Sequence, residues 1–253
     1  MTLDSKNICH FGTISEIKPD AEDTWSNKSF ITFDTDWAND DVLLDTMELV
    51  ENYRCGATWF ITHETKAVEK LRNNRQFELG IHPNFNCLLE HKKDFGRNAA
   101  DVLQRLHSIV PEATTVRSHS MMQSSRLLNM FRENGFTHDA NHFIPHHAGI
   151  NVKPWVLWNG LYRVPYIWED DLHHLFECGG ITQQSPRDIV LTGQGLKVFD
   201  FHPIHVFLNT ESVDRYKRTR ALHQKPQELV KHRFKGYGTR NRLVELLRLN
   251  KQS

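Results

Sequence analysis

The feature that most constrains this chain is the alternation of short apolar runs with helix-like stretches over most of its length. Runs rich in β-branched and aromatic residues predict strands at 30–33, 57–61, 77–81, 115–116, 161–168 and 196–201. Apolar residues at helical spacing predict helices between them, at 40–52, 65–73, 97–109 and 124–134. The region 141–160, rich in His, Pro and Trp, is expected to be an irregular excursion. Strands that alternate with helices form largely parallel sheets, so we expect an α/β fold, either open or closed into a barrel.

Length and segment composition favour a single domain. The chain has 253 residues, a length at which α/β barrels commonly remain undivided. No internal repeat and no low-complexity linker interrupts it. We therefore expect one domain over residues 1–253.

Four polar residues each follow the apolar run of a predicted strand. They are Asp34, His82, Arg117 and His202. In parallel α/β folds the carboxyl edge of the sheet carries the ligands and the catalytic groups. The sequence therefore predicts that these four side chains share one site.

The first of these positions carries two carboxylates, Asp34 and Asp36. If the segment stays extended, both side chains lie on one face, because strand side chains alternate. Asp36 could then bind a cation while Asp34 accepts a proton from water. The alternative is an Asp-rich loop that caps the following helix, and the spacing alone does not decide between the two.

The remaining strand ends supply imidazole, amide and guanidinium groups. His82 is a ligand type suited to zinc-like metals, whereas Asn86 offers a weaker neutral oxygen. Arg117 could pair with Asp34 and keep it ionised, the alternative being an ordinary surface ion pair. His119 is open to three interpretations: metal ligand, substrate contact or packing.

His202 precedes a proline and is expected to be fixed at its strand end, where a histidine can donate a proton to a leaving amine. His205 is the alternate candidate for that role. Trp37 could stack on a sugar ring, although core packing is the commoner fate of such aromatic residues.

Charge is balanced overall but not along the chain. Residues 212–253 hold twelve Lys or Arg against three Asp or Glu, a net charge of +9, so the remainder carries −9. A net charge of zero argues against nucleic acid as the main partner. The basic segment is interpreted either as a solvated helical end or as a contact for an anionic surface or sugar carrier. Scattered cysteines, and the absence of a secretory signal or a bilayer-length apolar stretch, favour a cytoplasmic protein.

Five motifs together resemble one enzyme family. TFDTDW, ATWFIT, ELGIHPNFN, VRSH and VFDFHPIH follow in the motif order of the NodB-type polysaccharide deacetylases, carbohydrate esterase family four. The resemblance covers about residues 30–208 and leaves 212–253 as a basic helical extension. It is closest to the divergent branch with an Asp-x-Asp first motif, which includes deacetylases of bacterial O-antigen gene clusters.

This resemblance implies a distorted, TIM-like (β/α) barrel of about seven strands and a metal-dependent hydrolysis of acetyl groups. By position it makes Asp34 the catalytic base, Arg117 the residue that orients the base, and His202 the general acid. It assigns the metal to Asp36, to His82 and to position 86. There Asn86 replaces the family's second histidine, which calls for another ligand such as His119.

The expected function is removal of an acetyl or similar acyl group from an amino sugar, in the biosynthesis of bacterial surface polysaccharide (O-antigen). Zinc is the expected metal, with nickel, cobalt or iron as alternatives. A lipid- or nucleotide-linked acetylated sugar precursor is the expected substrate. The alternatives are a catalytically impaired carbohydrate-binding relative, a DxD-type nucleotide-sugar glycosyltransferase, and a relative acting on a non-sugar amide.

Overall fold

A single curled sheet organises the molecule. The computed structural model describes residues 9–89 and 98–250. Within them ten strands pair in the order β7-β8-β6-β5-β4-β3-β2-β10-β9, with β1 beside β2. All neighbours are parallel except β7 and β8. The strands are β1 (His10–Gly12), β2 (Lys28–Asp34), β3 (Ala57–Ile61), β4 (Phe77–Ile81), β5 (Thr115–Val116), β6 (His138–Asp139), β7 (Trp155–Val156), β8 (Tyr162–Arg163), β9 (Trp168–Glu169) and β10 (Val198–Phe201).

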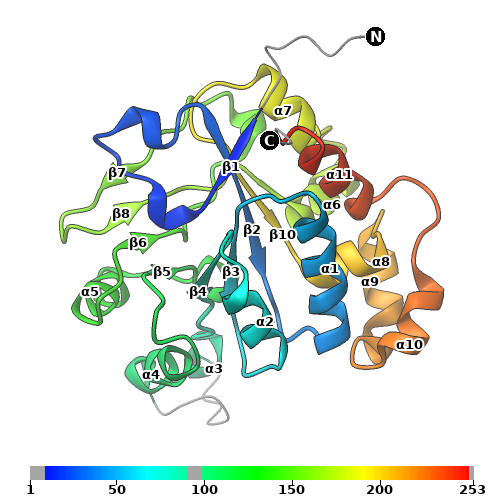
Figure 1. Ribbon diagram of the computed structural model, residues 1–253, viewed down its shortest axis with the longest axis horizontal. Helices are drawn as coiled ribbons and strands as arrows, with labels where there is room; N and C mark the ends of the chain where they lie inside the picture. Colours follow the sequence, from blue (N-terminus) through cyan, green and yellow to red (C-terminus); the bar gives the residue numbers. More distant parts are fainter. Residues whose placement is uncertain (1–8, 90–97, 251–253) are drawn as a thin grey trace.

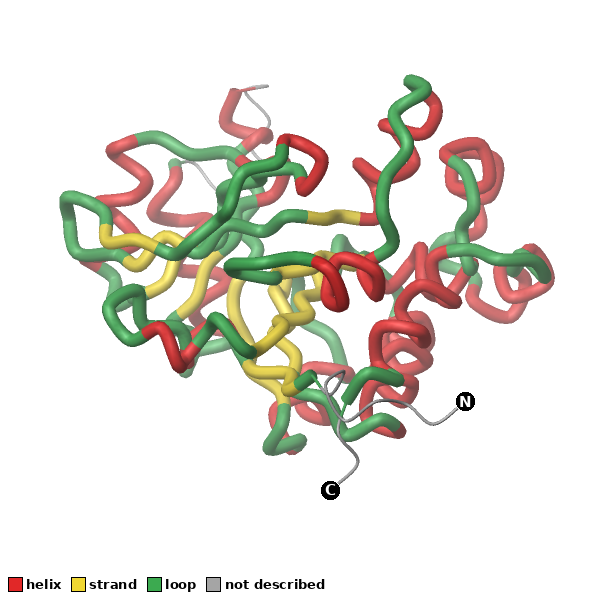
Figure 2. The backbone as a smooth tube through the Cα atoms, turned by 90° about the horizontal axis from the view of Figure 1, so that it is seen from above, coloured by secondary structure: helices red, strands yellow, loops and turns green. Residues whose placement is uncertain are grey.

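The two ends of this strand order are joined by a short connection. β8 belongs to one end and β9 to the other, yet only residues 164–167 separate them in the chain. The backbone N–H of Ile167 donates to the carbonyl of Val198 at 3.0 Å. The sheet must therefore curl, and Figure 2 shows the strands as a curved layer with helices around it. The predicted α/β barrel-like fold is confirmed, with more strands than the expected seven because several additional strands have only two or three residues.

The single strand predicted at 161–168 is wrong. This stretch forms β8 and β9, which pair with different neighbours, β8 with β6 and β9 with β10. Pro165 lies between them and has no backbone N–H to give to a sheet.

Helices connect and cover the strands (Figure 1). They are α1 (Asp40–Asn52), α2 (Ala67–Asn73), α3 (Asn86–Leu89), α4 (Ala99–Ile109), α5 (Ser125–Glu133), α6 (Asp170–Cys178), α7 (Pro186–Thr192), α8 (Pro203–Leu208), α9 (Val213–Thr219), α10 (Pro226–Leu229) and α11 (Thr239–Leu247). Short 3-10 helices occur at Ile14–Glu16, Glu22–Thr24, His119–Met121, His146–Ala148, Arg220–Leu222 and Val230–His232. The four predicted helices correspond to α1, α2, α4 and α5, and residue 97 lies outside the described residues.

Side chains cap the starts of three of the four predicted helices, α1, α4 and α5. Asn39 accepts a hydrogen bond from the backbone N–H of Asp41 at 3.0 Å, and Asn98 accepts one from Asp101 at 3.0 Å. Such caps satisfy N–H groups that have no partner inside the helix. They therefore favour the start of α1 at Asp40 and of α4 at Ala99.

The central strands are buried on both faces. Every residue of β3 and β10 is buried, as expected for parallel strands between a barrel interior and a layer of helices. Phe33 of β2 stacks on Trp59 of β3 with ring centroids 4.1 Å apart. This rigid core holds the carboxyl ends of the strands in fixed relation.

The C-terminal segment is part of the fold rather than a solvated end. Leu243, Leu246 and Leu247 of α11 are fully buried in the main core. Figure 1 places α11 beside α7 and α8. The interpretation of the whole basic segment as a solvated helical end is therefore wrong, because its apolar face completes the core. No helix within 9–89 and 98–250 is both long and apolar enough to cross a membrane.

Candidate active site

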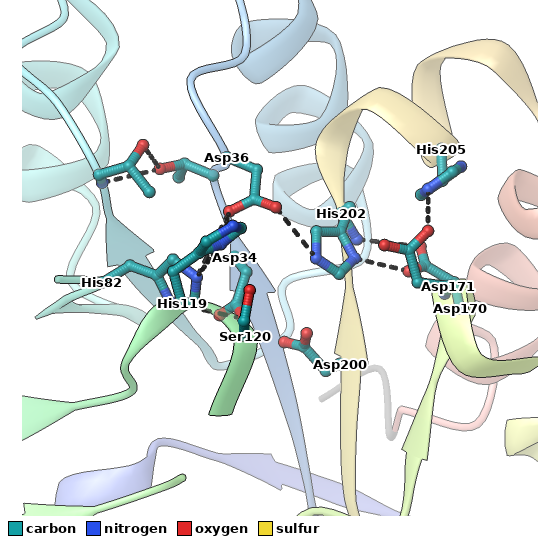
Figure 3. Close-up of polar contacts among 12 residues, drawn as sticks. Asp34, Asp36, His82, His119, Ser120, Asp170, Asp171, Asp200, His202 and His205 are labelled. Atoms are coloured by element: carbon teal, nitrogen blue, oxygen red, sulfur yellow. Dashed lines mark hydrogen bonds and ion pairs between the residues drawn. The ribbon is translucent and has the colours of Figure 1, made fainter. Parts of the chain in front are cut away.

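The four polar residues at the strand ends meet at one edge of the sheet, and Figure 3 shows three of them, Asp34, His82 and His202. Asp34 ends β2, His82 follows β4, Arg117 follows β5 and His202 follows β10. Arg117 Nη1 lies 3.1 Å from one oxygen of Asp34, and His82 Nδ1 lies 3.5 Å from the other. The parallel register therefore brings together residues that are distant in the sequence.

Asp36 reaches the same place by a turn rather than by strand alternation. The backbone of Asp36 and Trp37 is left-handed, with φ of 40° and 55°. The expectation that Asp34 and Asp36 share a face of an extended strand is therefore wrong. The turn nevertheless aims the Asp36 carboxylate between His82 and His119 on one side and His202 on the other (Figure 3).

One oxygen of Asp36 and two imidazole nitrogens form a compact triangle. Asp36 Oδ1 lies 3.3 Å from His82 Nε2 and 3.2 Å from His119 Nδ1, and the two nitrogens are 3.2 Å apart. This buried oxygen has no aligned hydrogen-bond partner among the described residues. Burial alone would raise the pKa of Asp36, but the adjacent His119 and His82 lower it well below the ordinary value.

The triangle has the dimensions and the donors of a first-row metal site. Zinc bonds of about 2.0–2.1 Å with tetrahedral angles place neighbouring donor atoms about 3.3 Å apart. Imidazole nitrogen and carboxylate oxygen are its usual protein donors outside thiolate sites. Converging acceptor atoms without aligned hydrogen bonds cost free energy unless a proton or a cation lies between them. The residues present therefore fit a divalent cation.

Asn86, predicted as a ligand, makes a different contact. It begins α3, and its side-chain amide donates to the hydroxyl of Ser120 at 3.1 Å. Ser120 directly follows His119, so Asn86 lies close to the site without belonging to the triangle described above. Trp37 packs edge-on against the His119 ring, with centroids 5.1 Å apart.

Arg117 is fully buried between two carboxylates. Its Nη1 contacts Asp34 and, more closely, Asp200, and it also donates to Thr32 at 2.9 Å. Its Nε donates to the carbonyl of Ala140 at 3.1 Å. The interpretation as a surface ion pair is wrong, because the side chain is 1 % exposed. Burial would lower the pKa of Arg117, but Asp200 and Asp34 raise it above the ordinary value, so the group stays charged.

Two aromatic rings complete the Arg117 pocket. Its guanidinium carbon lies 4.6 Å from the ring centroid of Phe60 and 4.5 Å from that of Tyr166. Cation–π contacts of this kind strengthen when they are removed from water. The guanidinium is therefore fixed in orientation as well as in charge.

His202 is held by a carboxylate that was not among the predicted site residues. Its Nδ1 lies 2.7 Å from Asp170 Oδ1, and its Nε2 points toward Asp36 Oδ2 at 3.5 Å. Burial would lower the pKa of His202, but Asp170 and Asp171 raise it well above the ordinary value. The alternate candidate, His205, instead pairs with Asp171 at 2.5 Å. Figure 3 shows it on the far side of that carboxylate from Asp36.

The missed carboxylates left signals in the sequence. Asp170 and Asp171 follow Trp168 and Glu169 in a run of acidic residues at the end of β9. Asp200 interrupts the otherwise apolar strand β10. A charged residue inside an apolar strand, or an acidic run at a strand end, is a recognisable indication of a buried polar network.

A cavity of about 780 Å³ opens beside the site. Trp37 and Asp40 line it, together with His63, Thr65 and Gln224. Trp37 connects the two, since it lines this cavity and packs against His119.

Comparison with known proteins places the chain among deacetylases. A family model described as WbmS-like polysaccharide deacetylase matches residues 31–220. A Bordetella bronchiseptica structure, described as a polysaccharide deacetylase involved in O-antigen biosynthesis, is 41% identical with a TM-score of 0.87, covering 95% of this chain and 98% of that one. No curated protein matches.

Two more distant structures are also similar. One is a polysaccharide deacetylase structure from Mycobacterium smegmatis, at 16% identity and a TM-score of 0.45, with 87% of this chain and 90% of that chain covered. The other is a family 4 carbohydrate esterase from Streptomyces lividans in complex with acetate, at 10% identity and a TM-score of 0.41, with 87% of each chain covered.

Proposed function

The chain belongs to the WbmS-like polysaccharide deacetylases, and on that premise we propose that it removes an acetyl group from an amino sugar by metal-assisted hydrolysis. One observation carries the proposal most directly. Ligand atoms of Asp34 and His202 lie within 4.8 Å of each other, beside the Asp36–His82 pair. A carboxylate and a protonated imidazole at this separation can act as base and acid on one bond.

The residues divide the reaction between them. Asp34, oriented by Arg117, takes a proton from water, and the water oxygen attacks the carbonyl carbon of the acetyl group. A divalent cation held by Asp36 and His82 would polarise the water and the carbonyl oxygen as a Lewis acid. As the C–N bond breaks, His202 gives its proton to the departing nitrogen. The products are acetate and the free amine.

His202 suits the acid role because of its surroundings. Asp170 accepts from both the ring and the backbone N–H of His202, at 2.7 and 2.9 Å. A proton shared with Asp170 through Nδ1 leaves Nε2 free to carry the proton that is donated. Asp170 and Asp171 raise the pKa of His202 above its ordinary value, which favours the imidazolium form that the acid role needs.

We further propose that the sugar is a lipid- or nucleotide-linked precursor of surface polysaccharide such as O-antigen. Six exposed cations lie on the segment from α9 to residue 235 and have no ion pair with any described carboxylate: Lys217, Arg218, Arg220, Lys225, Lys231 and Lys235. The same segment adjoins the site, since Gln224 donates to the Trp37 carbonyl at 2.9 Å. A diphosphate linkage would supply the negative charge that such a surface attracts.

Acetate release from defined precursors tests the proposal. Purified protein is incubated with N-acetylated sugars as nucleotide diphosphates, as lipid diphosphates and as neutral glycosides, and acetate is quantified. We expect release by the wild type, severe loss in H202A, and wild-type rates in H10A, a control on the exposed, opposite end of the sheet. Sugar transfer that survives in H202A would support a glycosyltransferase instead. Binding without acetate release from any substrate would support a carbohydrate-binding protein.

A further inference from the structure

We propose that His119 is the third donor to the cation, and that Asn86 is a positioning residue that holds the turn carrying it. The inference rests on the proposed metal-dependent function. In the deacetylase motif the third ligand stands four residues after His82. In this chain, we infer, the third ligand comes instead from the loop after β5.

The donor geometry favours His119 over Asn86. His119 Nδ1 is equidistant, at 3.2 Å, from Asp36 Oδ1 and His82 Nε2, so it closes the triangle evenly. The contact that the Asn86 side chain makes is with the turn itself, because its nitrogen donates to the hydroxyl of Ser120 at 3.1 Å. A neutral amide oxygen is also a weaker donor than imidazole to zinc-like ions.

The turn after His119 adopts a backbone that is unfavourable for its residues. Ser120 and Met121 are both left-handed, with φ of 56° and 54°. Residues with a Cβ persist in this conformation only where their surroundings hold them, and such strain gathers at functional sites. The strain in this turn therefore calls for contacts that maintain it.

Contacts from the β4 side fasten the turn. The backbone N–H of His119 donates to the carbonyl of Pro83 at 3.0 Å, and Asn86 binds the hydroxyl of Ser120. Pro83 directly follows His82, and Asn86 begins α3 three residues later. The loop that supplies the second ligand thus also places the third.

A second amide fastens the turn from the β6 side. Asn141 is fully buried, and its side-chain oxygen accepts from the backbone N–H of Ser118 at 2.6 Å. Its amide donates to Asp139, which in turn pairs with Arg163. The residue before His119 is therefore tied to the buried polar cluster of Asn141, Asp139 and Arg163.

Metal binding itself provides the test. Wild type, H119A, N86A, N86H/H119A and the control H10A are stripped of metal, and Zn²⁺ stoichiometry and affinity are measured with a competing chelator. We expect H119A to lose at least 100-fold in affinity. N86A should keep one zinc per chain and lose about 10- to 100-fold, as removal of a residue supporting a ligand typically does. N86H/H119A should regain part of the loss, because a histidine at position 86 restores the family pattern.

The outcomes separate this inference from the proposed function. Unchanged zinc affinity in H119A together with loss of zinc in N86A would make Asn86 the ligand and overturn the inference, whether or not acetate is released. A wild type without a stoichiometric zinc site would overturn it as well. Zinc binding in the expected pattern without acetate release from any substrate would leave the ligand assignment standing and reject the deacetylase function. Thermal unfolding of each metal-free variant checks that it folds.

Discussion

Asp170 holds His202 at two points with one carboxylate, accepting from ring Nδ1 at 2.7 Å and from the backbone N–H at 2.9 Å. The ring contact directs Nε2 toward Asp36, and the backbone contact fixes the residue immediately before α8. A single side chain thus sets both the orientation and the charge of the proposed acid.

Replacing Asp170 with asparagine should therefore impair proton donation without removing the histidine. In D170N the pKa of His202 should fall relative to the wild type, because a carboxylate that raises it is lost. We expect kcat/KM for acetate release to fall by about 100-fold, the lower end of the range for general acid catalysis. The alkaline limb of its pH profile should move to lower pH. If the alkaline limb of the D170N profile stays where it is in the wild type, Asp170 does not have this role. D20N, a substitution of an exposed aspartate, serves as the control.

Arg117 should be required for stability as well as for activity. R117A leaves the buried Asp34 and Asp200 without their cation, which we expect to cost about 3–5 kcal/mol in the free energy of unfolding. R117K keeps the charge but loses the planar group stacked between two rings, so it should fall between R117A and the wild type.

Urea denaturation of these variants measures the cost, with the exposed R126A as control. Equal stability of R117A and R126A would show that the two carboxylates do not depend on this guanidinium. Burial raises the pKa of Asp200 well above the ordinary value, despite the lowering effect of Arg117, so Asp200 is expected to take up a proton when Arg117 is removed.

Two buried histidines outside the proposed mechanism should make the protein sensitive to acid. Burial, with Arg242 and His174 adding to it, lowers the pKa of His173 from 6.5 to about 3, and burial lowers that of His174 to about 4. Below pH 6.5 the unfolded chain takes up protons that the folded chain does not. The stability that these residues contribute is therefore complete above pH 6.5. It falls as the pH drops toward about 4 for His174 and about 3 for His173. The fall in the free energy of unfolding is about 1.4 kcal/mol per pH unit for each histidine.

The difference between variants isolates this effect. Urea unfolding of wild type, H173Q/H174Q and the exposed control H10Q is compared at pH 7.5, 6 and 5. We expect the double variant to have a shallower fall in stability between pH 6 and 5 than the other two. Parallel curves for all three proteins would contradict the assignment of the acid sensitivity to α6.

Much of the fold could be predicted from the sequence because its signals are local. The apolar runs that became β2, β3 and β4 are continuous, and helix α1 has the same bounds as its predicted stretch. Asp34, His82, Arg117 and His202 were placed together because carboxyl ends of parallel strands share an edge. That argument needs only the order of strands and helices.

The rest depends on relations that local patterns do not carry. Pro165 is a local signal for the break within 161–168, but the different partners of β8 and β9 follow from closure of the sheet, which no short window reveals. The left-handed turn at Asp36 breaks the alternation on which its predicted orientation was based. The link between His202 and Asp170 joins two strand ends whose adjacency is set by the pairing of β9 with β10.

Substitution of each of the two carboxylates of the first motif, Asp34 and Asp36, should affect zinc binding and activity differently. Asn has nearly the shape of Asp but cannot accept a proton, so D34N should keep its zinc and lose about 10²- to 10⁴-fold in kcat, the usual contribution of a general base. D36N should lose zinc affinity and activity together, because Asp36 Oδ1 is one corner of the donor triangle. Zinc content and acetate release measured on the same preparations distinguish the two. If D34N loses zinc in parallel with activity, Asp34 is a ligand and not the base, and the division of roles within this pair is wrong. If D36N binds zinc as the wild type does, the triangle is not the metal site. The pair is a matched comparison, since both variants remove one negative charge within three residues of the same turn.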